Sequence, residues 1–250
     1  MSAKPVPYFL RVLNRLIRPF DLEVARSQFI LNRVKSGEFA WLRNQHVATV
    51  LDVGANTGQF AAMIRAILPD AYIYSFEPLR GCFNALQEQT RSLKNIQCFH
   101  CALGSSNGKT TIHANEFSPS SSLLTMSDLH KESFPYTKNT VEETIEIRTL
   151  DSFLPELRLQ KKVMVKIDVQ GFELNVLRGA EAALANVDIL IIETSFYELY
   201  VGQPLFEEVH RHMTERGFSY RGNFDQVYSA VSGEVLQADA IYIRRGESTP

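Results

Sequence analysis

The sequence has little that would mark a secreted or membrane-spanning protein. Its three cysteines, Cys82, Cys98 and Cys101, are an odd number with neither CxxC nor zinc-ligand spacing, so we expect reduced, packed thiols. No run approaches the roughly 20 apolar residues that cross a bilayer. Residues 1–20 lack the uninterrupted apolar region and the cleavage site of a signal peptide. These absences predict a cytoplasmic protein without a transmembrane segment.

An excess of positive charge is also missing. The formal net charge of the 250 residues is -2, and no basic tract is interleaved with aromatic residues. Proteins that bind nucleic acid usually carry such a basic surface. We therefore expect no nucleic-acid partner.

The first 46 residues are predicted to form an N-terminal helical extension. Apolar residues recur on one helical stripe between Phe9 and Phe20, while Arg11, Arg15 and Arg18 lie off it. Such a helix packs on its own domain or on a second subunit, which would make the protein a homo-oligomer. The alternative is a basic helix that makes peripheral contact with a membrane surface.

Residues 47–250 are predicted to form one α/β domain, because short apolar runs alternate with segments of helical period. The two runs at 162–169 and 187–195 are almost continuously apolar, as in central parallel strands. We expect helices on both faces of the sheet and a ligand site at the carboxyl ends of its strands. Expected strands lie at 47–53, 71–76, 96–103, 162–169, 187–195, 219–224, 226–231 and 239–245, and expected helices at 58–68, 79–91, 172–185 and 206–217.

The segment between residues 104 and 149 interrupts this alternation. It holds a stretch rich in Ser, Thr, Asn and Pro, "NEFSPSSSLLTMSDLHKESFPYTKN", between two alternating runs. The stretch is too polar for a core and too long for a simple connection. We predict a loop over the active site.

The stretch "VLDVGANTGQF" is a strand, a glycine turn and the start of a helix. The turn lets the backbone approach a ligand, but Asn56 stands where the dinucleotide fingerprint GxGxxG has its second glycine. Asp52, two residues before Gly54, favours a cationic ligand group over a pyrophosphate. S-adenosylmethionine brings both an ammonium and a sulfonium to such a turn.

A second acid supports this ligand. Glu77 ends the next strand in "YSFEPL", where a carboxylate can accept both ribose hydroxyls of an adenosine. A ribose acid also occurs in NAD enzymes, so Glu77 alone does not choose between the two cofactors. Asp52 and Glu77 together favour the methyl donor.

Four further motifs follow the glycine turn in order: "FEPL", "TLDSFL", "VKIDVQGFELNVLRGA" and "ILIIET". Through these motifs, residues 47–220 resemble the FkbM family of S-adenosylmethionine-dependent methyltransferases. The resemblance implies a class I methyltransferase fold, which is Rossmann-like, with a seven-stranded, mostly parallel sheet whose last strand is antiparallel. It also implies methylation of a hydroxyl on a sugar or natural product. The positions that it implies for cofactor binding are Asp52, Gly54, Asn56, Gly58, Glu77 and the backbone near Ala102.

The catalytic candidates lie at the ends of the two central strands. Asp168 is the first candidate for a general base or acceptor-binding carboxylate, Glu173 the second and Glu193 the third. Lys166 lies on the same side of its strand as Asp168 and could keep it ionised. Acids converging there could also hold Mg²⁺, but the sequence does not decide whether a metal is bound.

The sequence therefore predicts an S-adenosylmethionine-dependent O-methyltransferase that acts on a sugar, a lipid-linked glycan or a secondary metabolite. An N-methyltransferase or a nucleotide-sugar oxidoreductase on a similar sheet is the alternative enzyme. The alternative outside enzymes is a non-catalytic cofactor-binding module. The intact acids Asp168, Glu173 and Glu193 argue against such a module.

Overall fold

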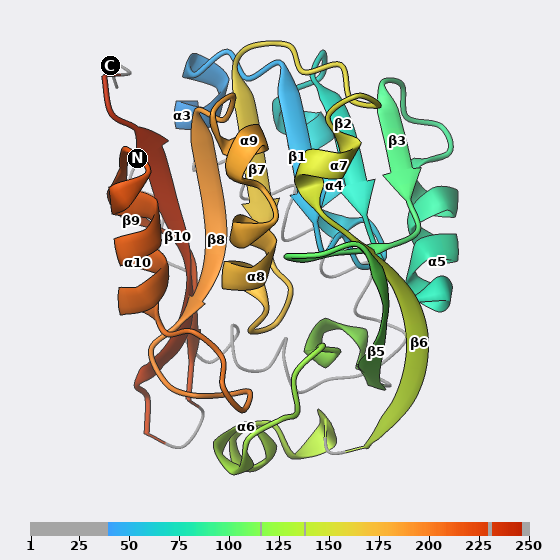
Figure 1. Ribbon diagram of the computed structural model, residues 1–250, viewed down its shortest axis with the longest axis vertical. Coiled ribbons are helices and arrows are strands. Elements are labelled where there is room, and N and C mark those ends of the chain that lie inside the picture. The colour runs from blue at the N-terminus through green and yellow to red at the C-terminus, as the bar shows by residue number, and fades with distance from the viewer. Residues whose placement is uncertain (1–39, 116, 138, 230–231, 247–250) are drawn as a thin grey trace, which may run out of the picture.

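The structure is a computed structural model that describes residues 40–115, 117–137, 139–229 and 232–246. Its centre is a seven-stranded sheet with the order β3-β2-β1-β7-β8-β10-β9, in which β10 runs antiparallel to both of its neighbours (Figure 1). The strands are β1 (Thr49–Val53), β2 (Tyr72–Phe76), β3 (Ile96–Phe99), β7 (Val163–Ile167), β8 (Ile189–Ser195), β9 (Phe218–Tyr228) and β10 (Val235–Arg244). The predicted class I methyltransferase fold, with a mostly parallel sheet, is confirmed.

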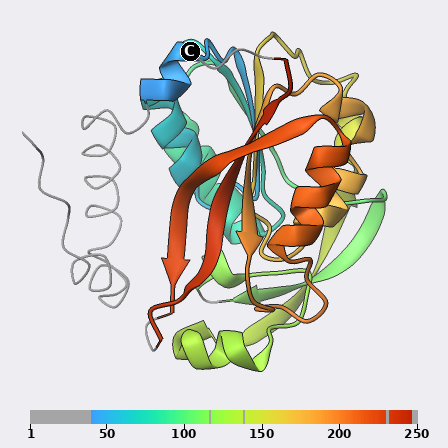
Figure 2. The same cartoon turned by 90° about the vertical axis from the view of Figure 1, so that its left-hand side faces the viewer.

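Helices cover both faces of this sheet. Figure 2 views the sheet close to its edge and shows α3 and α4 on one face and α8 and α10 on the other. All residues of β1 and β7 are buried, which explains their continuous apolar sequence. The helices are α3 (Ala40–Asn44), α4 (Gln59–Ile67), α5 (Arg80–Thr90), α6 (Asp128–Ser133), α7 (Leu150–Phe153), α8 (Glu173–Arg178), α9 (Glu181–Leu184) and α10 (Phe206–Glu215), with the 3-10 turns η1 (Ser118–Ser120) and η2 (Pro135–Thr137).

A second sheet lies below the carboxyl ends of the parallel strands in Figure 1. It has the order β4-β6-β5 and consists of β4 (Ala102–Leu103), β5 (Gly108–Asn115) and β6 (Thr140–Arg148). The expected strand at 96–103 is thus two strands, because the chain leaves the edge of the large sheet after β3 to pair with β6. The polar stretch predicted as a loop connects β5 to β6 and contains η1, α6 and η2.

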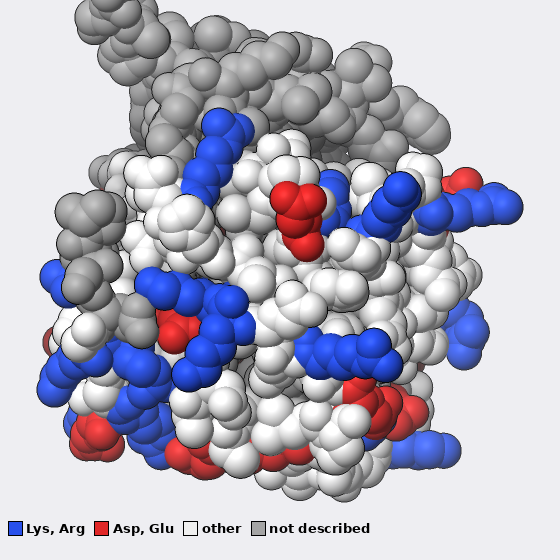
Figure 3. All heavy atoms as spheres, turned by 90° about the horizontal axis from the view of Figure 1, so that it is seen from above, with Lys and Arg blue, Asp and Glu red and all other residues white. Residues whose placement is uncertain are grey.

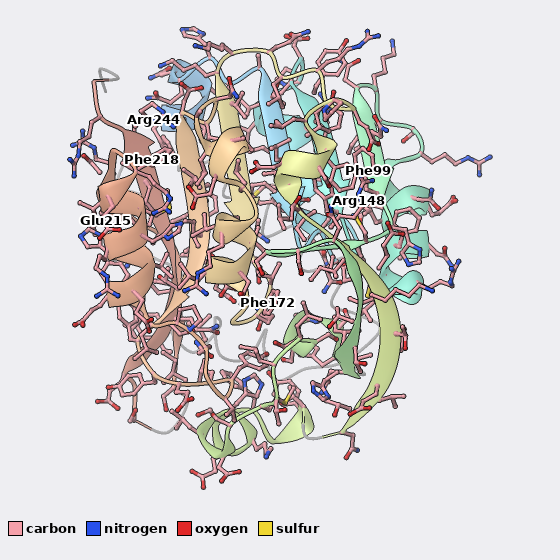
Figure 4. All side chains as sticks on the ribbon, in the orientation of Figure 1. Phe99, Arg148, Phe172, Glu215, Phe218 and Arg244 are labelled. Carbon is pink, nitrogen blue, oxygen red and sulfur yellow. The ribbon has the colours of Figure 1, made fainter. Side chains whose placement is uncertain are left out.

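Aromatic packing links the three-stranded sheet to the seven-stranded sheet. The ring of Phe99, at the end of β3, lies 5.0 Å from the ring of Phe76 and 4.8 Å from that of Phe153. The guanidinium of Arg148, at the end of β6, stacks 3.7 Å from the centre of the Phe153 ring. Phe99 and Arg148 lie close together in Figure 4. This contact fixes β6 and the segment before it relative to the strand ends.

The C-terminal segments form one hairpin of two strands, because the expected strands at 219–224 and 226–231 are a single strand, β9. β9 continues through Gly222, whose φ of 110° a glycine adopts without strain, and through register shifts against β10. The guanidinium of Arg244, at the end of β10, stacks 4.4 Å from the Phe218 ring and donates to the carbonyl oxygen of Val187 at 2.8 Å (Figure 4). The hairpin therefore closes the sheet beside β8.

The predicted helix at 172–185 is divided into α8 and α9. Gly179 follows α8, and a Cβ atom there would lie 1.9 Å from the carbonyl oxygen of Gly104. The helix is interrupted at Gly179 and Ala180, whose ψ angles of 9° and 19° lie outside the helical range.

Charge is distributed unevenly between the two ends of the sheet. Figure 3 looks onto the end where the parallel strands begin, and Lys and Arg side chains are more prominent there than Asp and Glu. The buried acids Asp52 and Glu77 and the half-buried Glu193 lie at or near the carboxyl ends of their strands. The expected ligand site, with its acids, therefore lies at the opposite end of the sheet from the face with more Lys and Arg.

The predicted N-terminal extension (residues 1–46) falls mostly outside the described residues, which begin at α3. Its helix, its contact with a membrane and its boundary with a domain at 47–250 stay predictions. None of the helices in the described part of the chain is long and apolar enough to cross a bilayer.

Candidate active site

The glycine turn after β1 packs directly on the end of β7. Gly54 has φ of 81°, and a Cβ atom there would lie 1.9 Å from the backbone oxygen of Asp168. Asn56 has φ of 50°, a left-handed conformation that asparagine tolerates better than most residues. Gly58, with φ of 94°, precedes the first residue of α4. The fold thus joins the predicted cofactor turn to the first catalytic candidate.

Asp52 lies beneath this turn and is fully buried. Its Oδ2 accepts a hydrogen bond from the Ser75 hydroxyl at 3.3 Å, while its Oδ1 has no partner among the described residues. Burial raises the pKa of Asp52 to about 6, although Lys166 and Ser75 oppose this shift. A cation near Oδ1 would favour the ionised form.

Glu77 follows β2, and its carboxyl group is held by two backbone donors. Oε2 accepts from the N–H of Asn56 at 2.9 Å and Oε1 accepts from the N–H of Leu79 at 2.8 Å. Burial raises its pKa to about 7, against the lowering effect of these bonds. Each carboxylate oxygen can still accept a further hydrogen bond, as binding of two hydroxyl groups requires.

One cavity of about 300 Å³ joins the predicted cofactor residues to the catalytic candidates. The site residues among its lining are Gly54, Asn56, Glu77, Ala102, Lys166 and Asp168. The described residues that line it do not include Asp52, Gly58, Glu173 or Glu193. These four residues could act on a ligand in the cavity only through other residues or solvent that lie between them and the ligand.

Asp168 is held in the cavity by two donors. Lys166 Nζ donates to Asp168 Oδ2 at 2.9 Å, and Gln170 Nε2 donates to Asp168 Oδ1 at 2.7 Å. Burial opposes ionisation of Asp168, but the charge and hydrogen bond of Lys166 outweigh it, so its pKa lies below the usual range. Burial lowers the pKa of Lys166, but the nearby Asp168 and Asp52 carboxylates raise it further, so its net shift is upward. The pair is therefore ionised near neutral pH.

Glu193 shares the Gln170 amide with Asp168. Gln170 Nε2 donates to Glu193 Oε2 at 2.6 Å. The pKa of Glu193 lies well above its usual range. Burial is the largest cause of this shift, and the charge of Asp168 is the second. The negative charge of Asp168 therefore disfavours ionisation of Glu193.

Glu173 supports the backbone beside the cavity. Its Oε1 accepts from the N–H groups of Val169 at 3.1 Å and Gly171 at 3.0 Å, and burial raises its pKa to about 7. This side chain shapes the turn between β7 and α8.

Sequence reasoning missed several residues that complete the site. Gln170 has φ of 55°, lines the cavity and bonds both Asp168 and Glu193. Its place in "KIDVQGFE", before a glycine at the end of a central strand, was an available signal. Tyr200, which donates to Gln170 Oε1 at 3.0 Å, lies in no motif. The cavity lining from the serine-rich stretch and the C-terminal hairpin consists of Ser118, Pro119, Ser121, Ser122, Leu123, Phe224, Asp225 and Asp239.

The described residues contain no group of three or more His, Cys, Asp or Glu side chains that could hold a metal ion. The three cysteines of the sequence are free thiols, as predicted.

The chain is similar to several known proteins to different extents. The chain is 27% identical over 161 residues to the 2-O-methyltransferase NoeI of Sinorhizobium fredii, which covers 62% of this chain and 66% of the relative. It is 30% identical over 145 residues to the hexuronic acid methyltransferase AglP of Haloferax volcanii, covering 57% of this chain and 54% of that protein. The chain thus spans less than two thirds of the length of either relative. A crystal structure of methyltransferase FkbM from Methylobacillus flagellatus KT aligns with a TM-score of 0.48 and 16% identity over 79% of this chain and 44% of that one.

The match to a family covers more of this chain than the match to either relative. The methyltransferase FkbM domain matches residues 52–220, which is more than half of the 250 residues. This range begins at Asp52 and includes every candidate site residue. The chain therefore belongs to the FkbM family of methyltransferases.

Proposed function

We propose that the chain transfers a methyl group from S-adenosylmethionine to a hydroxyl group of a sugar, a glycan or a secondary metabolite. One observation carries the proposal: a single cavity is lined by Glu77, suited to ribose hydroxyls, and by Asp168, suited to an acceptor hydroxyl. Methyl transfer needs both ligands in one space, because the acceptor oxygen must approach the methyl carbon in line.

The residues of the glycine turn fit this cofactor. Gly54 keeps the turn against the Asp168 backbone, where a side chain would collide. The carboxyl group of Glu77 is oriented by two backbone donors and has acceptor capacity left for hydroxyl groups. The buried Oδ1 of Asp52, without a partner in the described chain, suits a nearby cationic group.

The acceptor end supplies a fixed carboxylate. When bound, the cofactor would supply a methyl group on a positively charged sulfur, and that sulfur would retain the electron pair of the carbon–sulfur bond. Asp168 accepts a hydrogen bond from the acceptor hydroxyl and takes its proton as the oxygen bonds to the methyl carbon. A weakly basic carboxylate suffices, because the hydroxyl becomes strongly acidic as that bond forms. Lys166 keeps Asp168 ionised beforehand.

The relatives support a sugar hydroxyl as the acceptor. The name of NoeI specifies 2-O-methyl transfer, and that of AglP specifies a hexuronic acid. Transfer to an amine on the same fold is the competing outcome.

The test is identification of a product. The purified chain would be incubated with methyl-labelled S-adenosylmethionine and a cell extract or a panel of sugars, and labelled products analysed by mass spectrometry. We expect a label in an ether-linked methyl group on a hydroxyl. A label on nitrogen would reject the O-methyl assignment, and NAD binding without S-adenosylmethionine binding would reject methyl transfer altogether.

A further inference from the structure

The side chain of Gln170 connects the two acids of the site to a third residue. Its Nε2 donates to Asp168 Oδ1 at 2.7 Å and to Glu193 Oε2 at 2.6 Å, and its Oε1 accepts from the Tyr200 hydroxyl at 3.0 Å. An amide nitrogen carries two hydrogens, so both donated bonds form together. Every polar atom of this side chain is thus engaged.

Tyr200 determines which way the amide faces. The Tyr200 side chain is buried, and burial together with the surrounding acids raises its pKa well above the usual range, so the phenol keeps its proton. A phenol that donates to Gln170 Oε1 leaves Nε2 turned toward the acids. The opposite orientation would set an amide oxygen against the ionised Asp168. The observed one is therefore the only one that satisfies the three groups.

The backbone of Gln170 is bound to the serine segment, which we define as residues 117–123. The Ser122 hydroxyl donates to the Gln170 carbonyl oxygen at 2.6 Å, and the Tyr200 hydroxyl lies 3.3 Å from the Ser120 carbonyl oxygen. At its other end the segment meets the glycine turn, where the Ser118 hydroxyl donates to Asn56 Oδ1 at 3.0 Å. The serine segment thus bridges the two halves of the cavity, and Gln170 is its contact at the acid end.

We propose that Gln170 is a positioning residue that holds the Asp168 carboxylate toward the acceptor and couples it to the position of the serine segment. The inference rests on the proposed function, since it assigns Gln170 a part in that reaction. Loss of the amide would remove one of the two donors of Asp168 and the acceptor of the Tyr200 hydroxyl, while the bond from Ser122 to the Gln170 backbone would remain. The titratable or charged groups around Asp168 are Asp52, Lys166, Glu173, Glu193, Tyr200 and Asp239.

The direct test is a titration of Asp168 in the full chain. Carbon-13 NMR of labelled aspartate carboxyl groups would follow it, with the signal identified by its loss in Asp168→Asn. In Gln170→Met, which keeps the side-chain volume but donates no hydrogen bond, we expect the Asp168 midpoint to rise by about 1 pH unit. Tyr200→Phe should produce a smaller rise in the same direction. The exposed Gln87→Ala on α5 is the matched control and should produce none.

The second readout is protease cleavage within the serine segment in the presence of S-adenosylhomocysteine. Ser122→Ala, which loses the bond to the Gln170 backbone, should be cleaved several-fold faster than the parent and Gln87→Ala, and its Asp168 midpoint should rise as well. An unchanged Asp168 midpoint in Gln170→Met would overturn the inference, as would unchanged cleavage of Ser122→Ala. The titration needs no ligand, so a parent that fails to bind S-adenosylhomocysteine would count against the proposed function alone.

Discussion

Single residues decide how closely the two halves of the cavity approach each other. Gly54 combines φ of 81° with a backbone oxygen, that of Asp168, at 1.9 Å from where a Cβ would stand. Both features exclude other residues, the first by backbone strain and the second by a collision with main chain. The distance between the cofactor turn and Asp168 therefore depends on one missing side chain.

Gly54→Ala should accordingly separate β1 from the end of β7. We expect a loss of about 2 kcal/mol or more in the free energy of unfolding and loss of S-adenosylhomocysteine binding. Urea denaturation and calorimetry would measure the two effects. Gly246→Ala, with φ of 90° and open space around it, isolates the cost of backbone strain. Equal effects of both variants would show that the contact with Asp168 is unimportant.

Glu77 is expected to carry much of the affinity for the adenosine part of the cofactor. Glu77→Gln removes the charge but keeps one oxygen for the backbone donors, and Glu77→Ala removes both oxygens. Lost charge-assisted bonds of about 1.5 to 3 kcal/mol correspond to roughly 10- to 150-fold weaker binding in the Ala variant. Calorimetry with S-adenosylhomocysteine measures this, with the exposed Glu88→Ala on α5 as control. Parent-like affinity in Glu77→Ala would remove Glu77 from the binding site.

Asp168 is the residue on which turnover should depend most. Asp168→Asn keeps the size of the side chain but not its charge, so the fold and the affinity for S-adenosylhomocysteine should persist. We expect kcat to fall by roughly 100- to 10,000-fold, the range of general base catalysis. Asp70→Asn, at an exposed acid before β2, is the control for loss of charge. Methylation at the parent rate would remove Asp168 from the catalytic mechanism.

At the scale of elements, the connection between β5 and β6 borders the cavity. Its described residues form the short turns η1, α6 and η2, and its serine segment contacts the glycine turn and the Gln170 backbone through hydroxyl groups. A few backbone bonds, such as those between His113 and Ser122, also hold it. Short helical turns with few long-range bonds open at low free-energy cost.

We therefore predict that residues 115–140 are cleaved more slowly by protease when S-adenosylhomocysteine is bound, as in active-site lids. Ser118→Ala, which removes the bond to Asn56, should reduce that protection. Ser232→Ala, in the C-terminal hairpin, is the control. Equal cleavage rates with and without ligand would argue against a lid.

At the scale of the whole molecule, the site concentrates acids that bind protons more tightly when folded. Burial raises the pKa of Asp52 to about 6 and those of Glu77 and Glu173 to about 7, from ordinary values near 4. A carboxyl group whose pKa is higher in the folded state contributes stability at low pH and loses it as pH rises from the unfolded to the folded pKa. These three groups therefore lower the free energy of unfolding of the ligand-free protein as the pH rises from 5 to 7.5.

Glu173→Gln tests this contribution, because glutamine can still accept the bonds from Val169 and Gly171 but does not ionise. Relative to the parent, the variant should gain about 1 to 3 kcal/mol in the free energy of unfolding between pH 5 and pH 7.5. Urea denaturation at both pH values measures the difference. A constant difference between variant and parent would show that Glu173 ionises normally.

The sequence by itself determined the fold class, the glycine turn and the identity of the strand-end acids. These features are local: strand alternation, a strand–turn–helix junction and the position of Asp52, Glu77 and Asp168 after buried strands all follow from neighbouring residues. Lys166 and Asp168 were predicted to interact for the same reason, two residues apart on one strand, and their ion pair is present.

Only the tertiary structure decided what each acid does. Gln170 contacts Glu193 and Tyr200, which lie 23 and 30 residues further along the chain, and its left-handed backbone sends its side chain where strand alternation gives no guide. The tertiary structure likewise decided the division of residues 96–103 between two sheets. It also decided that the Glu173 carboxylate accepts hydrogen bonds from the backbone of its own turn. Hydrogen bonds between distant side chains depend on distances of a few tenths of an ångström and on burial, and both arise only when all the elements have packed.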